Sequence, residues 1–192
     1  MRIAKLVFED GTIFQGRAFS GSGDSFGEVV FNTAMAGYQE VLTDPSYHKQ
    51  IVLMTYPLIG NYGVNMDDFE SSKIHLSGFI IKEYSQLVSN WRSTESLSSF
   101  LNKYNIIGAE GFDTRALTKF IRSGGAKKAL LTTSTKPDNE LIELVNQSDS
   151  IVGQDLVKFV STDKAYDYAV PDEKKFNVAV VDCGVKHNIL EH

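Results

Sequence analysis

The chain has 192 residues, a net charge of -5 and 42% hydrophobic residues, which is typical of a folded globular protein and not of a disordered chain. A negative charge, without lysines and arginines clustered among aromatic residues, argues against nucleic acid as a partner. No apolar run approaches the ~20 residues that span a bilayer, and no signal peptide is recognisable, so we expect a cytoplasmic protein that does not enter a membrane.

The first part of the chain predicts β-strands. Residues 3–8 and 13–19 flank Asp10-Gly11, a dipeptide that favours the positive φ values of a tight hairpin turn. Gly21-Ser22-Gly23 lacks the lysine of a phosphate-binding loop, and we interpret it as a flexible hairpin connection. Further strands are predicted at 27–32, 50–56 and 74–81, with one more at 129–133.

Helical periodicity dominates the middle of the chain. A first helix is predicted with Ser93 or Thr94 as its N-cap. A second begins after Asp113, whose carboxylate can accept from free backbone N–H groups, and it ends at Gly124-Gly125. A third opens at Pro137-Asp138. The apolar residues with helical spacing are Leu97, Phe100, Leu101 and Tyr104, then Leu117, Phe120 and Ile121, then Leu141, Leu144 and Val145.

The last part of the chain predicts a domain boundary. Residues 161–175 are rich in charge and tyrosine and lack a period, which is typical of a linker, so we expect a first domain at 1–160. Residues 176–192 begin with a fully apolar run, 176–181, that resembles the first strand of a parallel sheet. A strand without neighbours cannot form a domain, so we expect this end to be frayed or packed onto the first domain. Residues 190–192 are interpreted as the start of an expression tag.

Three stretches resemble, in order, the small subunit of carbamoyl-phosphate synthase: GEVVFNTAMAGYQEVLTDPSY, QIVLMTYPLIGNYGVN and GFDTRALTKFIRSGGA. The resemblance covers about residues 6–160, and VVDCGVKHNIL extends it to the first strand of the family's class I glutamine amidotransferase domain. It implies a mixed α/β fold, with a layered β/β/α N-terminal domain followed by the truncated start of a parallel α/β amidotransferase domain.

The resemblance also implies a role. In this family the small subunit hydrolyses glutamine, and ammonia passes through a tunnel to a large subunit that uses ATP and Mg to make carbamoyl phosphate from bicarbonate, for pyrimidine and arginine synthesis. The N-terminal domain would dock the glutaminase domain against the large subunit. The expected partners are therefore the large subunit and L-glutamine, and no cofactor is expected in this chain.

Ser46 is the candidate binding residue. In Thr-Asp-Pro-Ser-Tyr it matches the serine with which the family's first domain contacts bound glutamine. A hydroxyl both donates and accepts a hydrogen bond, which suits the amino-acid end of glutamine at a seam between domains. The alternative is that Ser46 only closes the turn at Asp44-Pro45, as serine often does after proline.

No catalytic residue is expected in this chain. Cys183 follows an apolar run, but Asp-Cys-Gly-Val lacks the small residues on both sides of a nucleophile elbow, and we interpret it as a small buried hydrophobe. His48 follows Ser46 by two positions without an acidic residue to orient it, so a triad is not expected. No histidine pair has metal-ligand spacing, so no metal site is expected either. The 192 residues alone should then release no ammonia from glutamine.

Two other functions stay open. The chain is alternatively a stand-alone binding or scaffold domain of the same fold, which association with a large subunit would distinguish. It is alternatively a serine hydrolase that uses Ser46 and His48, which a serine-directed covalent probe would label.

Overall fold

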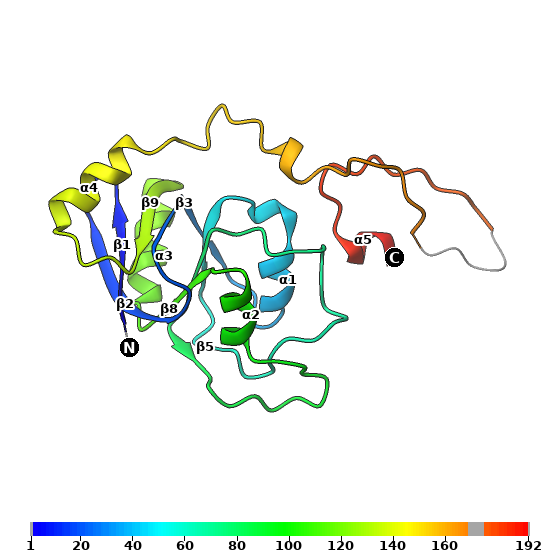
Figure 1. The fold of residues 1–192 in the computed structure, drawn as a ribbon, viewed down its shortest axis with the longest axis horizontal. Helices are drawn as coiled ribbons and strands as arrows, with labels where there is room; N and C mark the ends of the chain where they lie inside the picture. The colour runs from blue at the N-terminus through cyan, green and yellow to red at the C-terminus, as the bar shows by residue number, and fades with distance from the viewer. Residues whose placement is uncertain (1, 169–174, 192) are drawn as a thin grey trace.

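The computed structural model describes residues 2–168 and 175–191. Its main sheet is a closed barrel in the order β1-β2-β8-β6-β4-β3-β9, and β5 pairs with β7 in a separate small sheet. Figure 1 shows the barrel and α1 to α4 in one body, from which the chain after α4 runs along one side and turns back to α5. The strands are β1 Arg2–Phe8, β2 Ile13–Ser20, β3 Asp24–Asn32, β4 Gln50–Met54, β5 Leu58–Ile59, β6 Gly78–Ile80, β7 Glu83–Tyr84, β8 Ile107–Glu110 and β9 Lys127–Thr132; the helices are α1 Tyr38–Thr43, α2 Leu97–Lys103, α3 Thr114–Gly124, α4 Asp138–Gln147 and α5 His187–Glu191, with short 3-10 turns η1 Pro45–Tyr47 and η2 Val157–Phe159.

The mixed α/β class is confirmed, and so is the first hairpin. β1 and β2 pair antiparallel from Arg2 opposite Ala18 to Val7 opposite Ile13. Gly11 in the turn between them has a φ of 84°, a value that glycine adopts without strain. The strands at 27–32, 50–56 and 129–133 are confirmed as β3, β4 and β9, whereas only the second half of 74–81 is a strand, β6.

The connection at Gly21 to Gly23 is not a hairpin. β2 pairs with β1 and β8, while β3 pairs with β4 and β9, so these residues join two strands that are not neighbours in the barrel. Gly21 has a φ of 61°, and its N–H donates to Asn102 Oδ1 at 2.8 Å. An added Cβ at this position would run into the backbone of Ile106. The glycine therefore allows a close approach to Asn102 and to the backbone of Ile106, which local sequence did not predict.

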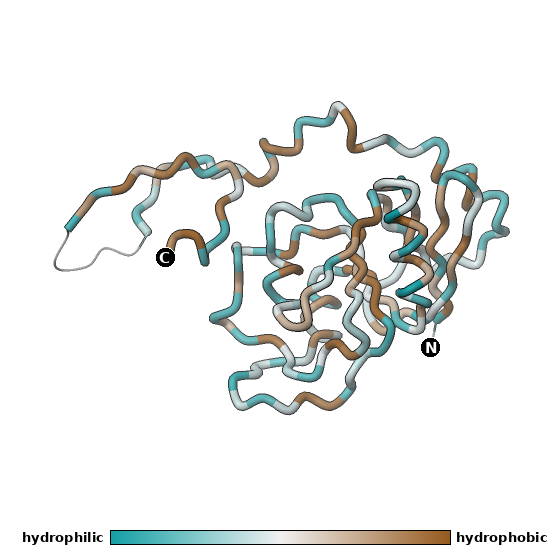
Figure 2. The backbone as a smooth tube through the Cα atoms, turned by 180° about the vertical axis from the view of Figure 1, so that it is seen from behind, coloured by the Kyte–Doolittle hydropathy of each residue, from teal (hydrophilic) through white to brown (hydrophobic). Residues whose placement is uncertain are grey.

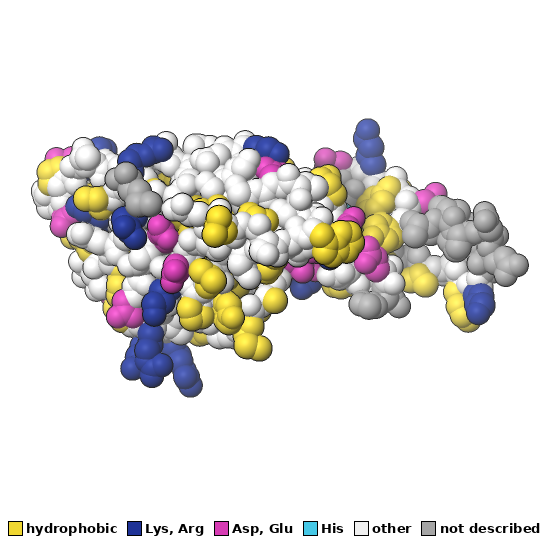
Figure 3. Space-filling view, turned by 90° about the horizontal axis from the view of Figure 1, so that it is seen from below, with side chains coloured by type: hydrophobic (Ala, Val, Ile, Leu, Met, Phe, Trp, Pro, Cys, Tyr) yellow, Lys and Arg dark blue, Asp and Glu magenta, His cyan; other side chains and the backbone are white. Residues whose placement is uncertain are grey.

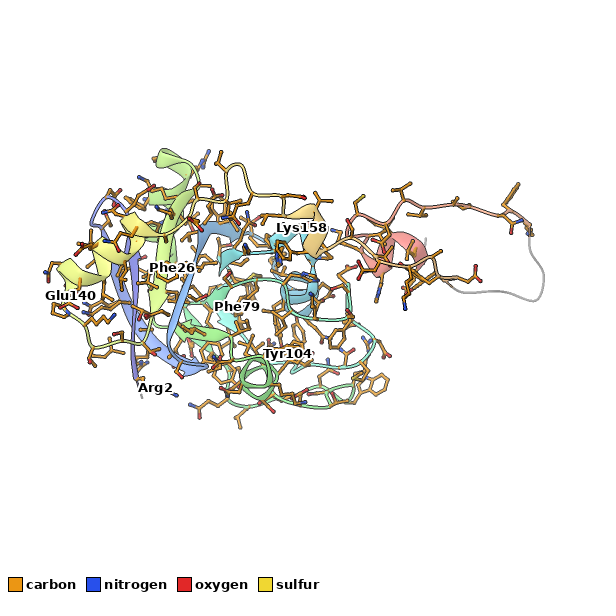
Figure 4. All side chains as sticks on the ribbon, turned by 45° about the horizontal axis from the view of Figure 1, so that its top comes forward. Arg2, Phe26, Phe79, Tyr104, Glu140 and Lys158 are labelled. Atoms are coloured by element: carbon orange, nitrogen blue, oxygen red, sulfur yellow. The ribbon has the colours of Figure 1, made fainter. Side chains whose placement is uncertain are left out.

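Strand alternation places apolar residues on both faces of the barrel wall. In β4, Ile51 and Leu53 belong to a cluster shared with α3, and Val52 and Met54 belong to a second cluster, beneath α1 and α2. All four of these side chains are fully buried. Phe79 of β6, labelled in Figure 4, belongs to the second cluster. A strand covered on both faces explains why this stretch is continuously apolar.

The predicted helices form, with one correction at an N-terminus. α3 begins after Asp113, whose Oδ1 accepts from Ala116 N at 2.9 Å, and it ends at Gly124 as predicted. α4 begins at Asp138 after Pro137. α2, however, is capped by Ser96, whose Oγ accepts from Ser99 N at 3.1 Å. The predicted cap Thr94 instead donates its hydroxyl to the backbone of the loop at Val64, because a tertiary contact outcompetes the local one.

The predicted strand at 176–181 is wrong, because no strand forms in residues 175–191. Phe176 and Val181 are 85% and 88% exposed. Figure 2 shows this apolar stretch lying away from the body. Cys183 is also exposed and not buried as predicted. Residues 182–191 instead return to the body and contact it, so of the two expected outcomes, a frayed or a packed end, this part shows the packed one. Residues 169–174 of the predicted linker and His192 lie outside the described residues.

Candidate functional site

Ser46 lies on a tight turn that follows α1 directly. Asp44 Oδ1 accepts from Ser46 N at 2.8 Å, and the carbonyl of Asp44 accepts from Tyr47 N at 3.1 Å. The Ser46 side chain is exposed, and its hydroxyl has no hydrogen-bond partner within residues 2–168 and 175–191. The carboxylate of Asp44 and the backbone therefore close this turn, and the alternative that the Ser46 hydroxyl closes it is not what the structure shows.

A buried polar network holds α1, which carries the turn. The fully buried Gln39 donates from Nε2 to the carbonyl of Asn65 at 2.6 Å and accepts at Oε1 from Asn65 N at 2.9 Å. Tyr62 OH accepts from the N–H groups of Gly37 and Tyr38, at 2.8 and 2.9 Å. Two of the motifs that carry the family resemblance thus fold against each other, and their polar residues build the support of the turn.

The two tyrosines of this network stay protonated. The rings of Tyr38 and Tyr62 stack with centroids 4.1 Å apart, and Tyr38 OH donates to the carbonyl of Gly63 at 2.6 Å. Burial raises the pKa of Tyr62 to about 12, and burial raises the pKa of Tyr38 still further. Both hydroxyls are therefore structural groups and not bases.

The end of α1 is hydrogen-bonded to the loop at Glu70 and Ser71. Thr43 Oγ1 donates to the carbonyl of Gln39 at 3.0 Å and accepts from Glu70 N at 2.9 Å. Ser71 Oγ donates to the carbonyl of Thr43 at 2.6 Å. Since Thr43 immediately precedes the Asp44 turn, this loop and the Ser46 turn are parts of one hydrogen-bonded unit.

Residues 182–188 pack against this unit. Lys186 Nζ lies 3.4 Å from Asp44 Oδ2, and Asn188 Nδ2 donates to Glu70 Oε1 at 2.6 Å. A Cβ added to Gly184, whose φ is 100°, would come within 3.2 Å of the Pro45 Cβ. The segment that carries Cys183 therefore lies next to the turn that carries Ser46.

The segment's own turn is closed by Asp182. Its Oδ1 accepts from Val185 N at 2.8 Å and from Gly184 N at 2.9 Å. These backbone hydrogen bonds, led by the one from Val185, hold the pKa of Asp182 below its usual range. Asp182 is thus a turn residue in the described structure, and it forms no hydrogen bond with Ser46.

The structure does not join Ser46 and His48 as a hydrolase pair. The His48 ring contacts His75 and Phe159, with centroids 5.8 and 5.5 Å away. Both of its ring nitrogens are buried and unpartnered within the described part of the chain. Burial lowers the pKa of His48, and burial lowers the pKa of His75 to about 4. No acidic side chain among the described residues orients His48, so they lack the geometry of a serine nucleophile and its base.

Among residues 2–168 and 175–191, no group of three or more His, Cys, Asp or Glu side chains could hold a metal ion. In the same residues, no helix combines the length and the apolar character needed to cross a bilayer.

Sequence reasoning missed the residues that support this turn, among them Glu70. It stands 118 positions from its partner Asn188, and no capping or turn pattern near it signals the contact. Only a signal that links distant positions could have found this pair.

Known proteins resemble this chain over nearly its whole length. Residues 6–131 match the family model described as carbamoyl-phosphate synthase small chain, CPSase domain. The carbamoyl phosphate synthase small chain of Syntrophotalea carbinolica is 45% identical over 98% of this chain and 54% of its own length. That of Thermotoga maritima is 49% identical over 97% of this chain and 47% of its own length.

The chain thus spans about half the length of the curated relatives it matches. Among solved structures, an aminopeptidase from Aneurinibacillus overlays with a TM-score of 0.39 and 19% identity, a likeness too low to bear on fold or function. The match of the family model across most of the barrel is the decisive finding. The chain belongs to the carbamoyl-phosphate synthase small-chain family.

Proposed function

We propose that this chain is the part of a glutamine-dependent carbamoyl-phosphate synthase that docks a glutaminase domain to an ATP-using large subunit, and that Ser46 contacts the amino-acid end of glutamine. The observation that carries the Ser46 role is its exposed hydroxyl on a rigidly held turn beside residues 182–188. Residues 1–160 would be the family's layered N-terminal domain, 161–175 the linker, and 176–192 the start of the amidotransferase domain. Cofactors, ATP and Mg, would belong to the large subunit.

The first test changes Ser46 in the full-length small chain assembled with its large subunit. Ser46→Ala removes one hydrogen bond to substrate, so we expect the KM for glutamine to rise about five- to tenfold with kcat little changed. Ser22→Ala is the matched control, because Ser22 is also exposed and lies on the loop between β2 and β3. An unchanged KM in Ser46→Ala would remove the substrate contact from the proposal.

The second test concerns the fragment. We expect the purified 192-residue chain to release no ammonia from glutamine above background, because the groups that break the amide bond would lie in the rest of the full-length protein. Ammonia release that depends on the concentration of this chain would overturn the proposal. Labelling of Ser46 by a serine-directed probe would favour the hydrolase instead.

The docking role is supported by exposed apolar side chains on ordered loops. The side chains of Leu87 and Trp91 are 83% and 92% exposed. Two backbone hydrogen bonds nevertheless hold their loop in place: Ser89 N donates to Asn61 O at 2.9 Å, and Ser85 N donates to Ile59 O at 2.8 Å. Figure 3 shows apolar side chains gathered on one part of the body's surface. Ordered, exposed tryptophan is typical of protein interfaces.

Co-purification with the large subunit tests the docking role. The 192-residue chain should retain measurable affinity for the large subunit, and Trp91→Ala should weaken it about tenfold or more. Phe176→Ala, in the exposed stretch away from the body, is the control and should have no effect. Absence of any association would favour a stand-alone scaffold domain.

A further inference from the structure

Glu70 is a buried carboxylate whose partners are uncharged. It is 6% exposed, and within the described residues it forms no ion pair. Its Oε1 accepts from Asn188 Nδ2 at 2.6 Å and its Oε2 accepts from Asn188 N at 3.2 Å. A buried carboxylate is costly unless its oxygens accept hydrogen bonds, so this site holds Asn188 strongly in place.

The backbone around Glu70 strengthens the same contact. The carbonyl of Glu70 accepts from His187 N at 3.0 Å. His187 Nδ1 lies 3.1 Å from the carbonyl of Phe69, to which it donates when that nitrogen carries the ring proton. Glu70 thus accepts from the first two backbone N–H groups of α5, those of His187 and Asn188, which a helix cannot satisfy internally.

Glu70 also connects directly to the turn of Ser46. Its own N–H donates to Thr43 Oγ1, and Thr43 is the last residue of α1, immediately before the turn. On the other side, Lys186 reaches Asp44 and Gly184 passes close to Pro45. One residue therefore fixes both sides of the seam between the Ser46 turn and residues 182–188.

We propose that Glu70 is a positioning residue for glutamine binding: its contacts with Asn188 and Thr43 set the distance between the Ser46 turn and the start of the second domain. This inference rests on the proposed function of Ser46. Glu70 does not touch substrate; it acts through the placement of the two segments that would.

Hydrogen exchange on the 192-residue chain tests the placement without any activity. Glu70→Ala should speed exchange of the amides at 187–191 about tenfold or more, because Asn188 N loses its side-chain acceptor and the segment loses the hydrogen bond from Asn188 Nδ2 that holds it against the body. Asn188→Ala should reproduce this from the other side of the contact, and Glu70→Gln should fall between, since it keeps one acceptor oxygen. Amides of β3 and β4 should be unchanged.

Glu110→Ala is the matched control. Glu110 is buried to a similar degree, 8% exposed, and its Oε2 accepts from Tyr84 N at 3.0 Å. Glu110→Ala should speed hydrogen exchange in β7 but leave exchange at residues 187–191 unchanged. Unchanged exchange at 187–191 in both Glu70→Ala and Asn188→Ala would overturn the inference.

Kinetics of the full-length chain with its large subunit test the link to glutamine. Glu70→Ala should raise the KM for glutamine about fivefold with kcat within about twofold, and Glu70→Gln should recover part of the loss. If Glu70 acts through Ser46, the double variant Glu70→Ala, Ser46→Ala should be little worse than Ser46→Ala alone, since coupled residues are not additive. Fully additive effects would overturn the inference. A Ser46→Ala variant with normal KM would instead refute the proposed function, while the exchange experiment still decides whether Glu70 places the segment.

Discussion

Two mainly apolar runs in this chain fold differently. Residues 50–54, Gln-Ile-Val-Leu-Met, form β4, whose last four side chains are fully buried. Residues 176–181, Phe-Asn-Val-Ala-Val-Val, form no strand, and Val178 is 82% exposed. β4 pairs with β3 on one side and β6 on the other, whereas the second run has no neighbouring strand among the described residues. An apolar pattern predicts a strand only where other strands supply hydrogen-bond partners and cover both faces.

Introducing a charge into each run should give the largest difference in unfolding free energy. Val52→Asp places a carboxylate in the fully buried cluster beneath α1 and α2, and we expect it to cost at least about 4 kcal/mol and to unfold the barrel. Val181→Asp puts the same change at a position that is 88% exposed, and it should alter the unfolding free energy by less than about 0.5 kcal/mol. Urea denaturation of both variants measures the difference. Equal destabilisation would mean that the second run is also part of the core.

Acid should weaken the region where the chain after α4 crosses the body. The pKa of His75 is lowered to about 4, mainly by burial. The positive charges of Lys73 and of protonated His48 contribute to this decrease in pKa, and the charge of Asp44 opposes it. The unfolded chain binds this proton near pH 6.5, so the neutral histidine stabilises the fold fully above that pH. The stability should then fall by up to about 3 kcal/mol as the pH decreases from 6.5 towards 4.

Denaturation series across this pH range test the acid effect. His75→Gln should have a flatter profile than the parent chain, because the titrating group is gone. A parent profile that is already flat between pH 6.5 and 4 would show that folding does not lower the pKa of His75.

The smallest effect on stability should come from a change between the Ser46 turn and residues 182–188. Gly184→Ala and Gly153→Ala both add a Cβ where φ is positive, 100° and 84°, so both carry a backbone cost of about 1 kcal/mol. A Cβ at Gly184 would lie 3.0 Å from Val160 Cγ2 and 3.2 Å from Pro45 Cβ, whereas a Cβ at Gly153 would have no atom of the described residues within 4 Å. We therefore expect limited proteolysis within 161–181 to be faster in Gly184→Ala than in Gly153→Ala. Equal rates would show that the close packing at Gly184 adds nothing.

Most of the secondary structure was predictable because its signals are local. The hairpin turn at Asp10-Gly11 and the two ends of α3, Asp113 and Gly124, depend on residues within a few positions of each other. α1 was missed because its six residues are too short for a helical period and are rich in polar groups that serve tertiary hydrogen bonds. A tertiary hydrogen bond also explains why Ser96 and not Thr94 caps α2. The Thr94 hydroxyl donates to the carbonyl of Val64, whereas Ser96 Oγ accepts from Ser99 N.

The sequence by itself determined the family, the mixed α/β class and the elements whose boundaries are set by neighbouring residues. Only the tertiary structure decided that the strands close into a barrel, that β2 and β3 are not neighbours, and that Glu70 meets Asn188 across 118 positions. The physical reason is the range of the interactions: caps and turns are satisfied within one turn of chain, whereas strand pairing and the burial of a carboxylate depend on partners that folding alone brings together.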